Sequence, residues 1–343
     1  MSSRVMSTLE SFAPTMEVYS IDEAFLDLTG VCHRNPTAYG HRISKAVIKA
    51  TGIPVCVGMA PTKTLAKLAN FAAKKWKHTK GVLDLSDPAR REKLMKLVLV
   101  GEVWGIGSKT SAKLNKMGVI TVWDLACQSS QRIHTQFNVV VARTVMELNG
   151  IACMELEDIT PNKQQIVCSR SFSRRLTSYN ELSQALAEFC SRAAEKLRHQ
   201  DSVTGCISIF IRTSPFNPQE PHYERSATLK LSAASQDTRT LINAANRLLA
   251  EIFRLGYNYQ KCGVQLSHIQ PATTSGQCEL FDFADDSLPT ENRPLMATED
   301  QINKRFPKKL IMAATGVDKS WQPKTERISQ RYTTDWKELV WVK

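Results

Sequence analysis

Residues 166–268 follow the order strand, helix, strand, strand, helix and strand, and this pattern constrains the fold more than any other feature of the chain. The order predicts a split βαβ arrangement, in which about a hundred residues form one antiparallel sheet covered by two helices. The predicted strands are 166–172, 207–213, 227–231 and 261–266, and the predicted helices are 180–199 and 237–255.

The rest of the chain divides into parts of different character. Residues 1–87 predict a mixed layer with only three short strands, at 18–21, 24–28 and 53–59, and with helices that include 40–50 and 62–76. Residues 88–152 are predicted to be helical, 153–165 to form a linker, and 271–343 to form a weakly patterned tail. We therefore predict an α+β multidomain fold with a self-contained domain at 166–270.

Composition narrows the classes of function. The net charge of +12 favours a polyanionic partner. No apolar run approaches the roughly 18 residues that a membrane span needs, and the N-terminus lacks the apolar core of a signal peptide. The nine cysteines include no C-x-x-C pair, which favours reduced thiols in a cytoplasmic protein.

Two adjacent carboxylates, Asp22 and Glu23, lie between two predicted strands, where a hairpin tip is expected. Two-residue hairpin turns favour Asn-Gly or glycine-rich pairs, and neighbouring carboxylates repel each other, so this pair is a poor choice for a turn alone. A Mg²⁺ ion bound to carboxylates and to substrate phosphates would remove the repulsion. The simpler alternative is a solvated acidic turn.

The predicted helix at 62–76 carries Lys63, Lys67 and Lys74 at spacings of four and seven, which places them on one face. Lysine is a compact charge suited to phosphate, although a solvated basic face gives the same pattern.

A third pattern is Gly-Ile-Gly at 105–107, followed by Lys109, between two helical stretches. It is typical of a helix-hairpin-helix, in which Gly105, Gly107 and the following amides bind nucleic-acid phosphates. A tight connection without a ligand is the alternative.

The acidic stretch after residue 276 contains Gln277, Leu280 and Phe281 in a Q-x-x-L-F pattern. This pattern resembles the peptide that binds the bacterial sliding clamp, although Cys278 and Glu279 depart from the usual form. Two large apolar residues in a polar segment favour burial by a partner.

Taken together, these patterns resemble the Y-family translesion DNA polymerases, and within them the catalytic subunits of bacterial DNA polymerase V. Residues 17–25 resemble the second catalytic motif, 58–70 the palm helix, 104–107 the thumb hairpin and 166–268 the little-finger domain. Four stretches resemble that subfamily in particular: 72–76, 137–140, 168–172 and 331–334.

The resemblance implies a partial polymerase palm at 1–87, a helical thumb at 88–152 and a little finger at 166–270. Asp22 and Glu23 would be carboxylates of a two-Mg²⁺ site, and Lys74, with Lys67 as a weaker candidate, would contact the deoxynucleoside triphosphate. Primer–template DNA would contact Gly105, Gly107 and Lys109 in the thumb and Arg170, Arg174 and Arg175 in the little finger. The partners implied are a processed UmuD dimer, RecA and the sliding clamp, in error-prone synthesis past lesions during the SOS response.

One departure from the family concerns the start of the chain. Family members begin with a strand bearing D-x-N-x-F-[YF], whose Asp is a third metal ligand, followed by the fingers. Met1 stands after both, which indicates a truncated gene, a late start codon or a fragment. The alternative functions are a catalytically inactive DNA- and clamp-binding protein, or a helix-hairpin-helix nuclease or glycosylase, which the 166–268 pattern disfavours.

Loss of a carboxylate that bridges both ions costs several kcal/mol of transition-state stabilisation, on the order of a thousandfold or more in rate. We therefore expect the chain of 343 residues to extend a primer very slowly with Mg²⁺. A primer-extension assay checks this, and robust incorporation would contradict it.

Overall fold

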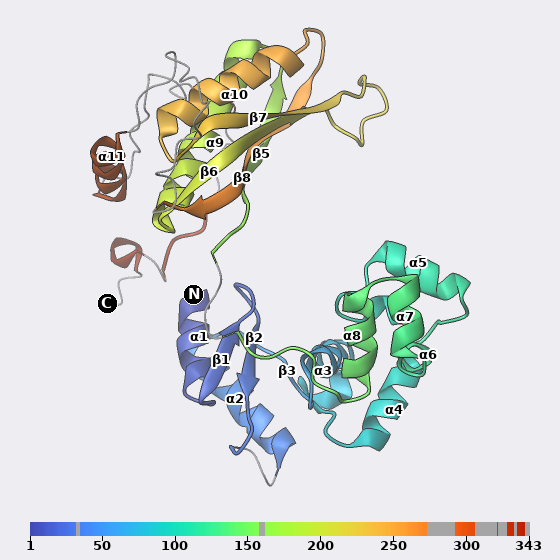
Figure 1. Cartoon of the computed structure of the whole chain (residues 1–343). Helices are drawn as coiled ribbons and strands as arrows, with labels where there is room; N and C mark the ends of the chain where they lie inside the picture. Colours follow the sequence, from blue (N-terminus) through green and yellow to red (C-terminus); the bar gives the residue numbers. More distant parts are fainter. Residues whose placement is uncertain are drawn as a thin grey trace. The chain divides into compact units, whose positions relative to one another are not determined.

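The computed structural model describes residues 1–31, 35–157, 162–272, 292–305, 321, 328–332 and 335–339. They belong to two compact units, Met1–Thr160 and Pro161–Lys343, each of which is considered by itself (Figure 1). Both units contain helices and sheets, so the predicted α+β multidomain class is confirmed. No helix among these residues is long and apolar enough to cross a membrane.

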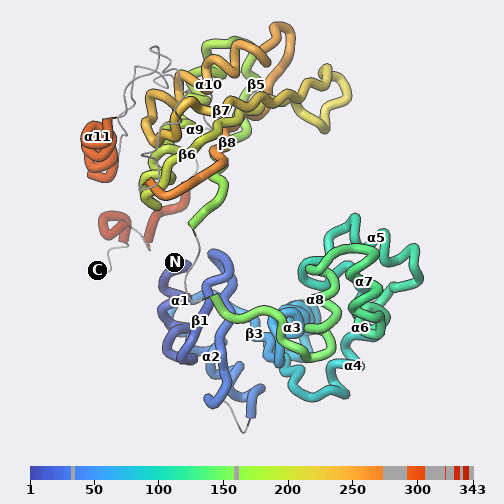
Figure 2. The backbone as a smooth tube through the Cα atoms, viewed as in Figure 1, coloured from blue at the N-terminus to red at the C-terminus, as the bar shows by residue number. Residues whose placement is uncertain are grey.

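The first unit begins with a helix and an antiparallel hairpin. Helix α1 (Ser2–Glu10) contacts both α2 (Pro36–Thr51) and strand β1 (Thr15–Val18), which pairs with β2 (Ala24–Asp27) in the hairpin (Figure 2). The Tyr39 hydroxyl of α2 donates to the Phe12 carbonyl at 2.7 Å, and their rings meet edge to face. The hairpin is therefore supported by its flanking segments.

A second small sheet carries the lysine-rich helix. Strands β3 (Val57–Met59) and β4 (Val82–Asp84) are parallel, and α3 (Lys63–Lys75) and the turn η1 (Lys77–Thr79) lie between them in the sequence. A Cβ atom on Gly58 would come within 2.3 Å of the Asn70 amide nitrogen of α3. Only glycine permits this close approach, so Gly58 fixes α3 tightly against β3.

Some strand predictions in this unit are wrong in position. The first predicted strand, 18–21, lies three residues too late, because residues 19–23 form a loop in which the amides of Tyr19 and Ser20 both donate to the Glu23 carbonyl. The predicted strand at 53–59 is confined to its last three residues, and β4 was not predicted. Neither β3 nor β4 is long enough to show an alternating pattern.

The helical part of the first unit contains α4 (Pro88–Leu97), η2 (Val100–Glu102), α5 (Ser108–Lys116), α6 (Val122–Ala126), α7 (Ser130–Gln136) and α8 (Val139–Leu148). Its buried residues form one core with the inner face of α3; these are chiefly Leu65, Leu68, Leu94, Leu114, Leu125 and Leu148. Helix α3 is thus shared between the small sheet and the helical part.

The second unit has the predicted βαββαβ order. Its elements are β5 (Ile166–Leu176), α9 (Tyr179–His199), β6 (Ser202–Arg212), β7 (Glu224–Ser235), α10 (Thr238–Ile252) and β8 (Tyr259–Pro271). The sheet order is β5-β8-β6-β7, and every neighbouring pair is antiparallel. Each βαβ pair therefore encloses a strand of the other, which is the split arrangement.

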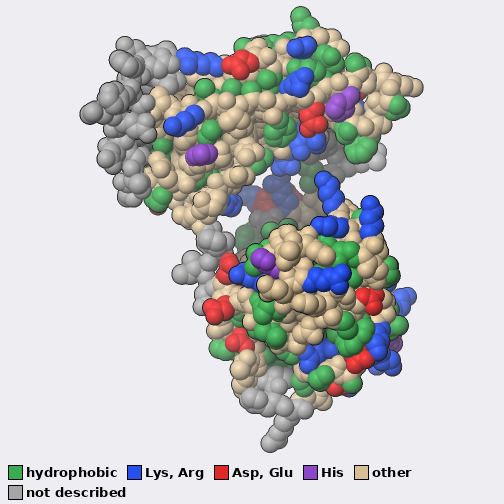
Figure 3. Space-filling model, turned by 45° about the vertical axis from the view of Figure 1, so that its right-hand side comes forward, with side chains coloured by type: hydrophobic (Ala, Val, Ile, Leu, Met, Phe, Trp, Pro, Cys, Tyr) green, Lys and Arg blue, Asp and Glu red, His purple; other side chains and the backbone are tan. Residues whose placement is uncertain are grey.

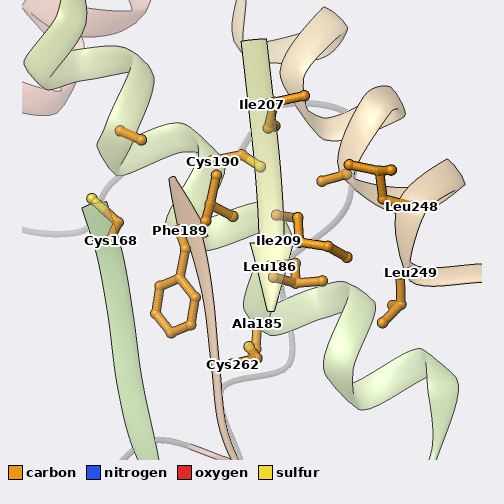
Figure 4. Packing of buried hydrophobic residues seen from close by; sticks show 14 of the residues in the cluster. Cys168, Ala185, Leu186, Phe189, Cys190, Ile207, Ile209, Leu248, Leu249 and Cys262 are labelled. Atoms are coloured by element: carbon orange, nitrogen blue, oxygen red, sulfur yellow. The ribbon is translucent and has the colours of Figure 1, made fainter. Parts of the chain in front are cut away.

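Apolar side chains fill the space between this sheet and its two helices (Figure 4). Phe189 of α9 and Leu248 of α10 meet Ile207 and Ile209 of β6 in this core. Cys190 and Cys262 are also fully buried there, and burial raises the pKa of both thiols. All seven cysteines within the described residues are free, in agreement with the predicted reduced state.

Two segments of the predicted tail are anchored to the second unit. In α11 (Arg293–Arg305), Met296 is fully buried and Asp300 accepts two hydrogen bonds of 2.7 Å from Arg198 of α9. Farther along, Trp321 is 2% exposed, and its ring centroid lies 5.9 Å from that of Phe172 and 5.4 Å from that of Phe189. The weak sequence pattern after residue 270 did not predict this attachment.

We expect Trp321→Ala to lower the free energy of unfolding of the second unit by about 3–5 kcal/mol, because it leaves a large cavity in the core. Denaturant unfolding checks this. Trp336→Ala is the matched control, since Trp336 lies in the same tail but is 86% exposed. Equal stability of the two variants would show that Trp321 does not contribute to the core.

Candidate active site

The predicted carboxylate pair lies at the tip of the β1–β2 hairpin. Asp22 is exposed, and one of its carboxylate oxygens accepts a hydrogen bond from the Ser20 hydroxyl. Glu23 is half-buried and forms an ion pair of 2.6 Å with Lys67 of α3. The two neighbouring carboxylates therefore differ: one is open to solvent and the other is already neutralised by an internal cation.

Helix α3 faces the hairpin through two lysines that are four residues apart. Lys63 forms an ion pair with Glu17 of β1 and also donates to the Glu155 carbonyl at 2.6 Å. The side chains of Lys63 and Lys67 are only 11% and 15% exposed. The alternative of a solvated basic face is therefore wrong for these two lysines, whereas Lys74, in the last turn of α3, is exposed.

Three aromatic rings surround the ammonium group of Lys67. Its Nζ lies 4.4 Å from the ring centroid of Tyr19, 5.6 Å from that of Trp104 and 5.8 Å from that of Phe25. The rings also contact one another, with centroids 5.5–5.9 Å apart. We call these three rings the aromatic box. Cation–π attraction and the carboxylate of Glu23 together hold the ammonium group.

Trp104 joins the helical part of the unit to the hairpin. Its indole Nε1–H donates to the Tyr19 hydroxyl at 3.1 Å. Gly105 follows directly, with a φ of +86° that favours glycine. Gly107 then precedes α5 as its N-cap and supplies no side-chain cap, so the first amides of α5 suit an anion. Gly105, Gly107 and Lys109 are all exposed.

A buried carboxylate fixes the N-terminus of α3. Glu147 of α8 is fully buried and accepts hydrogen bonds of 2.9 Å from the amides of Thr64 and Cys153. The Thr62 hydroxyl, at the N-cap of α3, donates to the Glu147 carbonyl at 3.0 Å. A carboxylate at this end also complements the helix dipole. Glu147 therefore sets the position from which Lys63 and Lys67 reach the hairpin.

The predicted DNA contacts of the second unit lie on β5. Arg170 is exposed, Arg174 forms an ion pair with Glu181 of α9, and Arg175 lies 3.3 Å from a carboxylate oxygen of Glu220. Lys and Arg side chains stand on the visible faces of both units (Figure 3). The clamp-binding pattern of Gln277, Leu280 and Phe281 lies outside the described residues.

The donor set at the hairpin tip suits a hard divalent cation. Mg²⁺ typically binds through one or two carboxylates together with substrate phosphates, and Asp22 and Glu23 supply two. Within the described residues there is no cluster of three or more His, Cys, Asp or Glu side chains that could hold a metal. Asp22 and Glu23 can therefore supply two ligands of such a cation, and the phosphates of a bound nucleotide would add others.

The motifs at 17–25 and 104–107 contain Glu17, Tyr19, Phe25 and Trp104, but the sequence did not predict the contacts of these side chains, and it did not indicate Glu147. The sequence does contain part of the information that places the hairpin against α3. Glu17 and Phe25 are opposed in the β1–β2 register, and the four-residue spacing of Lys63 and Lys67 suits two acceptors on one hairpin. The neighbouring sequence does not indicate the contacts of Trp104 and Glu147, because their hydrogen-bond partners, Tyr19 and Thr64, lie 85 and 83 residues away.

Comparisons with known proteins show which family this chain is similar to. The models of the impB/mucB/samB family and of its C-terminal domain match residues 1–70 and 163–280, and a domain of unknown function matches 293–342. Protein UmuC of Salmonella typhimurium is 47% identical over 100% of this chain and 81% of its own length. DNA polymerase IV of Clostridium acetobutylicum is 28% identical over 93% of this chain and 76% of its own length.

A solved structure agrees with the fold. It is a Y-family DNA polymerase chimera, Dbh-Dpo4(243-245)-Dbh, with a TM-score of 0.59 and 22% sequence identity. The match covers 79% of this chain and 75% of the other. At that identity the likeness supports the fold.

We expect Glu147→Ala to destabilise the first unit by about 2–5 kcal/mol, because it leaves two amides without their acceptor and opens a buried space. Thermal unfolding of the variant checks this. Glu102→Ala is a control on an exposed residue of the same helical part. If both variants unfold like the wild type, Glu147 does not hold α3.

Proposed function

The chain belongs to the impB/mucB/samB family, the UmuC group of Y-family DNA polymerases, and from this premise we propose that it carries out error-prone translesion DNA synthesis in the SOS response. The similarity to Protein UmuC over the whole of this chain and 81% of that protein supports this proposal. The observation that carries it in the structure is the presence of both family carboxylates at the hairpin tip, beside the lysine face of α3.

The reaction is the attack of a primer 3′-hydroxyl on the α-phosphorus of a deoxynucleoside triphosphate, with release of pyrophosphate. Two Mg²⁺ ions, when bound, activate the attacking oxygen and stabilise the leaving one. Asp22 and Glu23 hold the cation from the hairpin. Lys74, exposed on the same face of α3 as Lys67, binds the triphosphate, and Lys67 is a second candidate for that contact.

Both units contribute to binding primer–template DNA. The loop of Gly105 and Gly107, with Lys109, binds backbone phosphates at the N-terminus of α5. Arg170, Arg174 and Arg175 bind the DNA backbone from β5, where Glu181 and Glu220 orient the last two. Contacts of this kind position the duplex without reading its sequence.

The partners proposed for this activity are a processed UmuD dimer, RecA and the sliding clamp, the last through Gln277, Leu280 and Phe281. Because its substrates are DNA and nucleotides, we expect the activity in the bacterial cytoplasm. The alternative is a catalytically inactive DNA- and clamp-binding protein. The two functions differ in whether a nucleotide matched to the template joins the complex.

Formation of a templated ternary complex tests the proposal without turnover. We measure binding of a fluorescent primer–template that ends in a dideoxynucleotide, by anisotropy, with Mn²⁺ and each deoxynucleoside triphosphate. The complementary nucleotide should tighten DNA binding by about tenfold, which is about 1.4 kcal/mol. The other three nucleotides should have little effect.

The double variant Asp22→Asn, Glu23→Gln should keep binary DNA binding and lose the tightening, because it lacks the carboxylates that hold the cation. If no nucleotide tightens DNA binding by the wild type, the inactive alternative holds. If DNA binding itself shows no dependence on salt, the proposed phosphate contacts are wrong.

A further inference from the structure

The environment of Lys67 differs from that of its neighbour on α3. Lys63 is held by Glu17 and by the Glu155 carbonyl, so it has two oxygen acceptors from separate segments. Within the described residues, the only hydrogen bond recorded for the Lys67 ammonium group goes to Glu23. The remaining contacts of this group are the three rings of the aromatic box.

Because of these contacts, Lys67 occupies the place at Glu23 that a metal cation would otherwise take. The ammonium group is largely shielded from water, and at 2.6 Å it neutralises the carboxylate directly. A divalent cation that uses the same oxygen must separate this pair. The flexible four-carbon stem of lysine allows the ammonium group to leave without movement of α3.

We propose that Lys67 is a built-in counter-cation of Glu23, and that a divalent cation binds at Asp22 and Glu23 by displacing it. This inference rests on the proposed function, since it concerns the same carboxylates. In the metal-free protein the ammonium group of Lys67 compensates the charge of the Glu23 carboxylate and holds its side chain in place. The price is a lower affinity for the divalent cation, because the ion competes with an internal charge.

The aromatic box sets how strongly Lys67 competes. Tyr19 and Phe25 belong to the hairpin, whereas Trp104 comes from the helical part and directly precedes Gly105. Trp104 also holds Tyr19 in place through its indole hydrogen bond. Trp104 is therefore a positioning residue that links the proposed phosphate-binding loop to the ion pair of Lys67 and Glu23.

The test measures binding of Mn²⁺ alone to the full chain by electron paramagnetic resonance, without DNA or nucleotide. We expect Lys67→Met to raise the Mn²⁺ affinity of the site by about tenfold, because the competing cation is gone and the side chain keeps its length. Lys67→Arg, which keeps the charge, should stay close to the wild type. Trp104→Leu should fall between the wild type and Lys67→Met.

Lys96→Met is the matched control. Lys96 on α4 also forms an ion pair of 2.6 Å, with Glu92, and lies 5.2 Å from the Trp123 ring, but this pair is exposed and has only that one ring. This control should bind Mn²⁺ like the wild type. An equal rise for Lys96→Met would show a general effect of net charge and overturn the proposal.

The outcomes separate this inference from the proposed function. Suppose that Lys67→Met and the wild type bind Mn²⁺ equally and that the double variant Asp22→Asn, Glu23→Gln abolishes binding. The proposed role of Lys67 as counter-cation is then wrong, but the proposed metal site stands. If no Mn²⁺ binding depends on Asp22 and Glu23 in either background, both proposals are wrong. A rise confined to Lys67→Met and Trp104→Leu supports the inference.

Discussion

The ion pairs between helix α3 and the β1–β2 hairpin are the contacts on which the candidate site depends. Glu17 and Glu23 lie on the hairpin. They form ion pairs with Lys63 and Lys67, which lie one helical turn apart on α3. The position of α3 is fixed in turn by Gly58 on one side and by the buried carboxylate of Glu147 at its N-terminus. A short and otherwise exposed hairpin is thereby held at a defined place beside the basic helix.

The sequence predicted those features whose causes are local. The alternating and helical patterns of 166–268 predicted the split βαβ unit, and the poor turn chemistry of Asp22 and Glu23 indicated a functional loop. It did not predict contacts between distant segments. Trp104 and Tyr19 are 85 residues apart, and their hydrogen bond exists only because the helical part folds back on the hairpin. Three-residue strands such as β4 are too short for any pattern.

The C-terminal segment also has contacts that its local sequence did not predict. Its amino acids predicted a weakly patterned tail, yet α11 and Trp321 are anchored to the second unit by one bidentate ion pair and one buried ring. These anchors are a few side chains in a polar segment, and no periodicity reveals them. The region matched by the domain of unknown function therefore contributes at least three residues, Met296, Asp300 and Trp321, to the structure of the second unit.

We propose that Asp22 and Glu23 hold the divalent cation of a nucleotidyl transfer site. A crystal structure of the chain with primer–template DNA, a complementary nucleotide and Mn²⁺ tests it most directly, because anomalous scattering locates the manganese. We expect manganese bound to oxygens of both carboxylates and to the nucleotide phosphates, with Lys67 released from Glu23. Manganese bound elsewhere, with the Lys67–Glu23 pair unbroken, would contradict it.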